Sequence, residues 1–208
     1  MSPRRPPLTR ELVIAAALRI VDRDGLDGLT MRTLGRELRV DPMAVYHHLP
    51  NKAAVLDGVA EAVMGEVPLD APAGLRWTER LARLARGYRA ALRAHPNALP
   101  VVATRPDVSP AALAVLDATL GVLLQAGFEP AAALEALHAA SVFVVGHALD
   151  ESGAGDNAEA AAAQRVMLES GAYPNLAAVA SAGGSVTPDD TFEAGLAALI
   201  AGFERRLR

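Results

Sequence analysis

The side chains in this sequence that could do chemistry gather at positions 46–48, where a tyrosine precedes two histidines, and at Lys52, the only lysine in the chain. Phenol, imidazole and ammonium groups can donate hydrogen bonds to base edges and to phosphate oxygens. The chain contains no cysteine, and it carries no nucleophile elbow, phosphate-binding loop or HExxH zinc motif. The cluster therefore favours recognition of DNA over catalysis.

Two short helices and a tight turn would hold this cluster in place. Thr30 is a good N-cap for the first helix, and Arg39 and Val40 would form the turn. Asp41 would then cap the second helix, whose first position is Pro42, where a missing N–H costs nothing. This order of elements predicts a helix-turn-helix.

The second of these helices would have one buried face and one exposed face. Leu34 in the first helix and Val45 and Leu49 in the second would point inward. The outer surface then mixes small, aromatic and imidazole side chains, namely Met43, Ala44, Tyr46, His47 and His48. A short exposed helix of this kind has the form of one that reads the major groove. A plain three-helix scaffold whose second helix only packs is the alternative, and it leaves the exposed Tyr-His-His face unexplained.

Helices on either side complete the predicted unit. A first helix would begin after Thr9 and end at Gly25 and Gly28, with a buried stripe formed by Leu12, Val13, Ala16, Ala17, Ile20 and Val21. Another helix, after the helix-turn-helix, would run over residues 51–65 and link the two halves of the chain. Its start presents Lys52 together with free backbone N–H groups, where a DNA phosphate could dock.

The stretch from Thr9 to Met64 resembles the DNA-binding domain of the TetR repressors. The features that carry the resemblance keep a fixed spacing: they are GLDGLT at 25–30, MRTL at 31–34, VYHH at 45–48, and Asn51-Lys52 with Leu56 behind them. The resemblance implies contacts with operator DNA from Thr30, Arg32, Pro42, Met43, Ala44, Tyr46, His47, His48 and Lys52.

Size and composition set the fold class. The chain has 208 residues, of which 51% are hydrophobic and only 4% aromatic, and alanine and leucine are abundant. Both are strong helix formers, and runs typical of strands are nearly absent. We therefore expect an all-α protein, with a three-helix helix-turn-helix domain followed by a larger helical domain for ligand binding and dimerisation. The boundaries we expect are 1–52 for the arm and helix-turn-helix, 53–66 for the linking helix and 67–208 for the second domain.

Charge is distributed unevenly along the chain. Residues 1–52 carry a net charge of +3 and residues 53–208 a net charge of −7. The positive end coincides with the helix-turn-helix, as phosphate binding requires. Residues 1–8 would form an arm whose arginines, Arg4 and Arg5, could reach a phosphate or the minor groove, and plain disorder is the alternative.

No segment of the sequence indicates secretion or insertion into a membrane. The proline-rich N-terminus lacks the apolar core of a secretory signal. No apolar run reaches the length of a membrane span without glycine, proline or charge. A cytoplasmic protein is expected.

Helical periodicity continues through the second half. Helices are expected at about 75–94, 97–103, 110–126, 130–151 and 188–208, with a short one at 160–170. Residues 171–187 look loop-like. Six arginines lie between positions 76 and 93. They indicate a solvent-exposed helix face more than a binding site for nucleic acid, because arginine is the usual cation of this chain.

The resemblance to TetR repressors continues more loosely into the second half. The segments 123–128, 143–150 and 192–204 are similar to those of the tetracycline-repressor type of C-terminal domain. This implies that the helices ending near Asp150 and Arg208 pair two copies of the chain. It also implies an effector pocket formed by Tyr88, Thr104, Arg105, Thr119, Leu134, Leu137 and His138.

Two observations bear on metal binding. In the family, a histidine precedes a Thr-Arg-Pro segment, but here Val101 and Val102 precede Thr104-Arg105-Pro106, so a strong metal donor is missing although Asp150 is present. His147 lies three and four residues before Asp150 and Glu151, a spacing on one helix face that could bind a metal. The simpler interpretation is a histidine at the dimer interface that makes ordinary hydrogen bonds. We expect no metal and no cofactor, and an apolar or weakly polar effector.

The sequence thus predicts a ligand-responsive transcriptional regulator. It would act as a repressor, bind a palindromic operator as a homodimer and be released by a small molecule. The alternative is a non-regulatory α-helical protein, such as a small enzyme or a protein-binding module. Binding to a palindrome upstream of the chain's own gene would distinguish them, because only the first hypothesis requires it.

Overall fold

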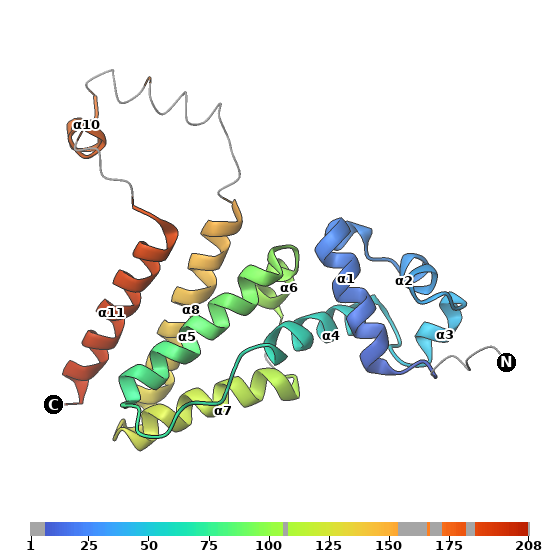
Figure 1. Ribbon diagram of the computed structural model, residues 1–208, viewed down its shortest axis with the longest axis horizontal. Coiled ribbons are helices and arrows are strands. Elements are labelled where there is room, and N and C mark those ends of the chain that lie inside the picture. The colour runs from blue at the N-terminus through green and yellow to red at the C-terminus, as the bar shows by residue number, and fades with distance from the viewer. Residues whose placement is uncertain (1–6, 106–107, 154–165, 167–171, 182–185, 208) are drawn as a thin grey trace. The chain divides into compact units, whose positions relative to one another are not determined.

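In a computed structural model of the chain, which describes residues 7–105, 108–153, 166, 172–181 and 186–207, helices are the only regular elements of these residues (Figure 1). The N-terminal helices are α1 (Arg10–Gly28), α2 (Met31–Leu38), α3 (Pro42–Tyr46) and α4 (Lys52–Gly65). They are followed by α5 (Trp77–Ala94), the 3₁₀ turn η1 (Pro96–Ala98), α6 (Leu99–Thr104), α7 (Pro110–Gln125), α8 (Pro130–Gly153), α10 (Pro174–Ser181) and α11 (Pro188–Arg206). The all-α prediction is confirmed.

Side-chain caps start the helices where the sequence predicts. The Thr9 hydroxyl accepts from the Leu12 N–H at 3.3 Å, and the Asp41 carboxylate accepts from the Met43 N–H at 2.8 Å. Ser109 caps α7 in the same way. Each cap satisfies a backbone N–H that has no partner within its helix, so these residues fix where the helices begin.

The buried stripe of α1 packs against α4. Val13, Ala17 and Ile20 are wholly buried, as predicted. Leu12, however, is 43% exposed, because it shares an outer face with Ala15 and Arg19, one and two turns further on. The prediction that Leu12 is buried is therefore wrong.

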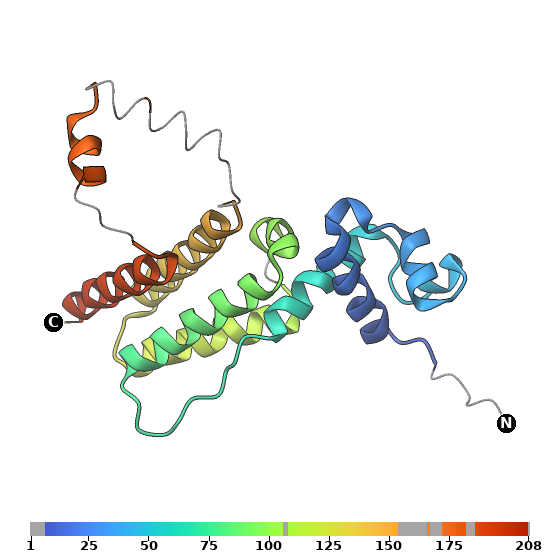
Figure 2. The same ribbon diagram turned by 45° about the horizontal axis from the view of Figure 1, so that its top comes forward.

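Within the first compact part of the chain, helix α4 lies between α1 to α3 on one side and α5 to α7 on the other in both views (Figures 1 and 2). It packs on α1 and also on α5, α6 and α7. Its residues Val55, Val59 and Val63 have no exposed surface. Because α4 contributes to the packing on both of its sides, it is the element that can transmit a change from one to the other.

Alanine and branched side chains fill the larger helical core. Helices α5, α7 and α8 contribute most of it, including Leu81, Leu92, Val122, Leu123 and Val144. The ring of Trp77 meets that of Phe128 edge-on, with centroids 5.4 Å apart. Gly127, at φ 100°, makes the turn before α8 that the sequence predicts.

Packing divides the chain into two compact units, one ending at Ala148 and the other running from Leu149 to Arg206. The first contains the helix-turn-helix together with α4 to α7 and most of α8. The second contains α10 and α11. The functional boundaries expected after residues 52 and 66 stay predictions.

Several expectations for the second half need correction. Residues 174–181 form α10, although the prolines and glycines of 171–187 are typical of a loop. The helix forms because residues 176–180, between them, are mostly strong helix formers. Arg89 is only 7% exposed, so the predicted solvated arginine face of α5 is wrong at that position. The short helix expected at 160–170 and the arginines of the N-terminal arm lie outside the described residues.

Helix α8 is the one described helix long and apolar enough to cross a membrane by length and composition. Its apolar residues Leu134, Val142 and Leu149 are each more than 40% exposed in the single chain. A helix in the core of a helical protein meets the same criterion, so length and composition alone are weak evidence for a membrane span.

Gly58 permits the close approach of α4 to α1, and we expect its replacement by Ala to destabilise the protein. A Cβ at this position would lie 2.6 Å from Ile14 Cγ1, so the two helices must separate or Ile14 must move. The overpacking should lower the free energy of unfolding by about 1–2 kcal/mol despite the better helix propensity of alanine.

Urea denaturation measures this change, and Gly121→Ala in α7 is the matched control. A Cβ at Gly121 has no neighbour within 4 Å, so this variant should gain stability from helix propensity alone. Equal effects at the two positions would contradict the packing described for Gly58.

Candidate functional site

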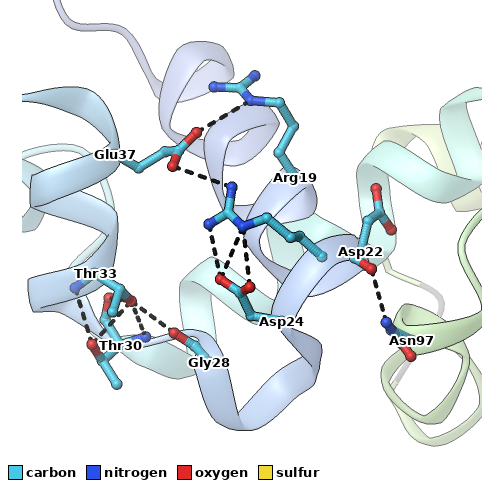
Figure 3. A network of polar contacts seen from close by, with 9 residues as sticks. Arg19, Asp22, Asp24, Gly28, Thr30, Thr33, Glu37 and Asn97 are labelled. Atoms are coloured by element: carbon cyan, nitrogen blue, oxygen red, sulfur yellow. Dashed lines mark hydrogen bonds and ion pairs between the residues drawn. The ribbon is translucent and has the colours of Figure 1, made fainter.

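The start of α2 is fixed by a reciprocal pair of threonines. The Thr33 N–H donates to the Thr30 hydroxyl at 3.0 Å, and the Thr30 N–H donates to the Thr33 hydroxyl at 2.9 Å. The Thr33 hydroxyl also donates to the Gly28 carbonyl at 2.8 Å, which ties α2 to the end of α1 (Figure 3). Sequence reasoning found Thr30 but missed Thr33, because the third helical position of such a reciprocal cap is usually Glu or Gln and here it is a threonine.

Ion pairs hold α2 against α1. Glu37 of α2 lies 3.6 Å from the Arg19 guanidinium and 3.5 Å from that of Arg23. Arg23 also contacts Asp24 at 2.8 Å (Figure 3). These pairs are largely exposed, so they orient α2 more than they stabilise it.

The turn between α2 and α3 is tight. The Val40 N–H donates to the Gly35 carbonyl at 2.9 Å, and Arg39 adopts a left-handed backbone with φ 53° and ψ 45°. A Cβ at Gly35 would lie only 3.1 Å from Pro42, so the two helices approach closely at this point. The predicted turn at Arg39 and Val40 is confirmed.

Helix α3 presents the predicted reading face. Met43 is 66% and Tyr46 40% exposed, whereas Val45 and Leu49 are buried beneath them. Helix α3 ends at Tyr46, so His47 and His48 occupy the turn that follows, with His47 exposed and His48 half-buried. The two histidines therefore extend the exposed surface beyond the end of the helix.

The remaining predicted DNA-binding residues lie in α3 itself or in the segments just before and after it. Thr30 and Arg32 are exposed at the start of α2, while Pro42 and Ala44 are half-buried in α3. Lys52 is exposed at the start of α4, with its ammonium 3.5 Å from the Leu26 carbonyl. All nine residues thus come from three neighbouring segments of one compact unit.

A small apolar cavity lies among α4, α5, α7 and α8. Its volume is about 40 Å³. Tyr88, Thr119 and Leu137 line it as the family resemblance predicts. Sequence reasoning missed the others, which are mostly apolar residues that look like ordinary core: Met64, Leu81, Leu84, Ala85, Val115, Leu116, Ala140, Ser141 and Val144.

Four of the predicted effector residues lie outside this cavity. Leu134 is 59% exposed on α8, and His138 is exposed one turn later. The Thr104 hydroxyl donates to the Pro100 carbonyl at 2.7 Å, within its own helix. Arg105 reaches α4 instead, where it donates to the Ala53 carbonyl at 3.3 Å and pairs with the Asp57 carboxylate.

A second and larger cavity of about 430 Å³ adjoins α4 on the side of α1, α6 and the start of α7. The ion pairs Arg10–Glu61 and Arg105–Asp57 lie at its edge. Met64 lines both cavities, so its side chain stands between them. The carboxylates of Asp57 and Glu61, one helical turn apart on α4, were the available sequence signal for this charged edge.

His95 joins three elements. Its Nδ1 lies 2.9 Å from an Asp22 carboxylate oxygen of α1, and its Nε2 lies 3.1 Å from Glu66, which follows α4. Asn97 of η1 adds a hydrogen bond of 2.9 Å to the Asp22 carbonyl (Figure 3). No local pattern in the sequence predicts this cluster, because its members are up to 75 residues apart.

The two carboxylates favour a charged imidazole. Burial by itself would lower the pKa of His95, but the hydrogen bonds to Asp22 and Glu66 and their negative charge outweigh it, so the pKa is raised above its ordinary value. Only the protonated ring can donate to both carboxylates at once.

Among the residues that the structure describes, no group of three histidine, aspartate or glutamate side chains could hold a metal ion, since Asp22 and Glu66 contact opposite nitrogens of the His95 ring. The His147 ring lies against Phe143, with centroids 5.9 Å apart.

Comparison with known proteins gives matches over almost the whole chain. A model of bacterial regulatory proteins of the tetR family matches residues 13–59, and one of the tetracyclin repressor-like C-terminal domain matches residues 69–207. The tetracycline repressor protein class A from transposon 1721 of Escherichia coli is 38% identical, over 93% of this chain and 89% of its own length.

Solved structures agree with these matches. ActR from Streptomyces coelicolor, in complex with actinorhodin, is 30% identical with a TM-score of 0.85, over 97% of this chain and 99% of that one. BioQ with its double-stranded DNA operator is 29% identical with a TM-score of 0.63, over 72% of this chain and 90% of that one.

Two variants separate phosphate binding from base reading on this surface. Lys52→Ala should weaken binding to all DNA sequences alike and lower the slope of log affinity against log salt by about one unit per chain. His47→Ala should instead change the preferred base at one position of each half-site, by roughly 1–3 kcal/mol. Selection from a randomised duplex library measures the base preference, and binding titrations at several salt concentrations measure the slope. Parental base preferences in the His47 variant would show that the reading face is misassigned.

Replacing His95 by Gln tests the charged imidazole. A histidine whose folded pKa exceeds its unfolded value of about 6.5 stabilises the fold below that pH, and the stabilisation disappears as the pH rises through the folded pKa. The loss of unfolding free energy caused by His95→Gln should therefore be largest below about pH 6.5 and shrink as the pH rises through the folded pKa of His95, as measured by urea denaturation.

Asn97→Ala is the control for this experiment. It removes the hydrogen bond from the Asn97 amide to the backbone carbonyl of Asp22. Neither of these groups titrates, so the effect should not depend on pH. A loss for His95→Gln that stays constant across the range would mean that the folded imidazole is neutral.

Proposed function

The chain belongs to the TetR family of bacterial regulatory proteins, and we propose the following roles for its own residues. It is a ligand-responsive transcriptional repressor that acts on operator DNA as a dimer. The family resemblance inferred from the sequence is confirmed, and the alternative of a small enzyme or protein-binding module is set aside. The exposed α3 surface, held by caps and by a tight turn, is the single observation that carries the DNA-binding assignment.

We propose that α3 and the two histidines after it enter the major groove. Tyr46 and His47 would face base edges, and Arg32 and Lys52 would bind phosphates on either side. The operator complex of BioQ supports this use of the fold. Because a dimer presents two such surfaces, the operator should be an inverted repeat with half-sites about one helical turn apart, or a multiple of it.

We infer that the domain division expected from the sequence applies to this function. The family models that match residues 13–59 and 69–207 support a DNA-binding part and a separate effector part with α4 between them. Operator binding places the protein with the chromosome, so we propose that it works in the cytoplasm.

The effector site proposed here is the small cavity, enlarged when a ligand enters. Its lining is apolar apart from the hydroxyls of Tyr88, Thr119 and Ser141, so it suits a mainly apolar molecule with few polar groups. The actinorhodin complex of ActR supports a small-molecule effector in this fold. Ligand sites usually measure about 300–1,000 Å³, so the cavity must widen by several times its volume.

Widening the cavity gives the proposed switch. Met64 of α4 forms part of the wall, so an effector that needs more room must displace it or move the helix. Arg105 connects the end of α6 to Ala53 and Asp57, near the start of α4. An effector that binds the displaced arrangement more tightly would shift α4 with Lys52 and change the spacing of the two reading surfaces.

We propose that α8 and α11 pair with their copies in a second chain to form the dimer. The exposed apolar row on α8 supports this, as does the likeness to the tetracyclin repressor-like C-terminal domain, whose match extends to residue 207. Four helices related by a two-fold axis would then cover surfaces that a single chain leaves open.

Filling the cavity should produce a repressor that no longer responds to its effector. Thr119→Trp and Leu137→Trp each place an indole where the ligand must enter, while Leu113→Trp on the exposed side of α7 is the control. An effector is first identified by a thermal-shift screen of the parent protein. Mobility-shift titrations with the upstream palindrome should then show parental operator affinity and release by the effector for the control. The two cavity variants should show no further release when the effector is added, and any loss of their operator affinity without effector measures how far the indole itself displaces Met64 and α4.

Each failure in this experiment has a distinct meaning. Release of the Thr119 and Leu137 variants at parental effector concentrations would mean that the effector binds elsewhere. A parent protein that binds no palindromic DNA would contradict the regulatory function itself.

A further inference from the structure

Arg39 is held in a backbone conformation that favours glycine. It is the only non-glycine residue with positive φ in the described part of the chain, at φ 53° and ψ 45°. For a residue with a Cβ this left-handed conformation is unfavourable. At the other described positions with positive φ, the chain uses Gly25, Gly74 and Gly127.

The surrounding turn requires this conformation. The Val40 N–H reaches back to the Gly35 carbonyl at 2.9 Å, and the Arg39 N–H reaches the Arg36 carbonyl at 3.1 Å. These bonds close α2 by the arrangement in which glycine is the usual left-handed residue. The close approach of Gly35 to Pro42 leaves little room to open the turn, so the strain at Arg39 cannot relax locally.

Strain retained by a non-glycine residue points to a role for its side chain. Arg39 is exposed, and it lies two residues before Asp41, the cap of α3. It therefore directly precedes, along the chain, the residues that would enter the groove. A planar guanidinium is well suited to bind a phosphate through two hydrogen bonds.

We propose that Arg39 binds a phosphate of the operator backbone beside the major groove and thereby anchors the turn that positions α3. This inference rests on the proposed assignment of α3 as the reading helix. It adds a phosphate contact from the turn itself to the contacts proposed for Arg32 and Lys52.

The proposal predicts opposite effects of one substitution on stability and on DNA binding. Arg39→Gly removes both the strain and the charge. Relief of the left-handed strain should raise the melting temperature by roughly 2–4 °C. Loss of one phosphate contact per chain should lower the salt slope of a dimer by about 1.8 units and weaken operator and random DNA alike.

Two further variants separate strain from charge. Arg39→Lys keeps the charge and the strained backbone, so its melting temperature should equal that of the parent and its salt slope should be retained. Arg86→Gln, at an exposed position of α5, removes one charge elsewhere and should leave the salt slope unchanged. The measurements are thermal unfolding, and fluorescence anisotropy with the operator duplex and a scrambled duplex at several salt concentrations.

The possible results distinguish this inference from the proposed function. A more stable Arg39→Gly protein with parental affinity and salt slope would overturn the phosphate contact. A less stable one would overturn it as well, because the arginine would then have a structural role in the fold. A parent protein that does not prefer the operator duplex would instead reject the function on which the inference rests.

Discussion

Burial of α4 on both sides is the constraint on which the rest of the structure depends. Val55, Val59 and Val63 form one continuous hidden row, and Gly58 lets Ile14 of α1 come within contact distance of the same helix. Closely packed interiors resist continuous deformation and move between discrete arrangements. In the proposed switch, a helix bound in this way would shift as a rod, so that displacement of Met64 would be transmitted to Lys52 at the other end.

Polar contacts around α4 have a different character from its apolar row. Arg105 joins its first turns to α6, and His95 joins Glu66, beyond its last turn, to Asp22 of α1. Most of these charged groups are partly exposed, and such pairs contribute little net stability. The apolar row provides the rigidity of the helix, and the polar contacts join its two ends to α6 and α1.

Local signals in the sequence were sufficient for the helix-turn-helix and insufficient for much of the second half. Thr9, Thr30, Asp41 and Ser109 cap helices where expected, because a cap depends only on residues two or three positions away. The burial of Arg89, the carboxylate partners of His95 and the position of Arg105 against α4 depend on residues distant in sequence, which no periodicity reveals. The effector residues were expected only by resemblance, and of these Tyr88, Thr119 and Leu137 share one cavity. Arg39 was expected in a turn, but its strained backbone has no signal in the residue type.

The edge-on contact between Trp77 and Phe128 gives the protein a built-in spectroscopic probe. Trp77 is the only tryptophan in the chain, and it reports on the packing of α5 against the turn before α8. Helices α1 to α4 contain no indole, so the intrinsic emission follows the larger helical core, whereas circular dichroism follows every helix. Coincident transitions in the two signals are the mark of a single cooperative unit. Without any label, the native chain can therefore report whether its reading helices melt together with the core or before it.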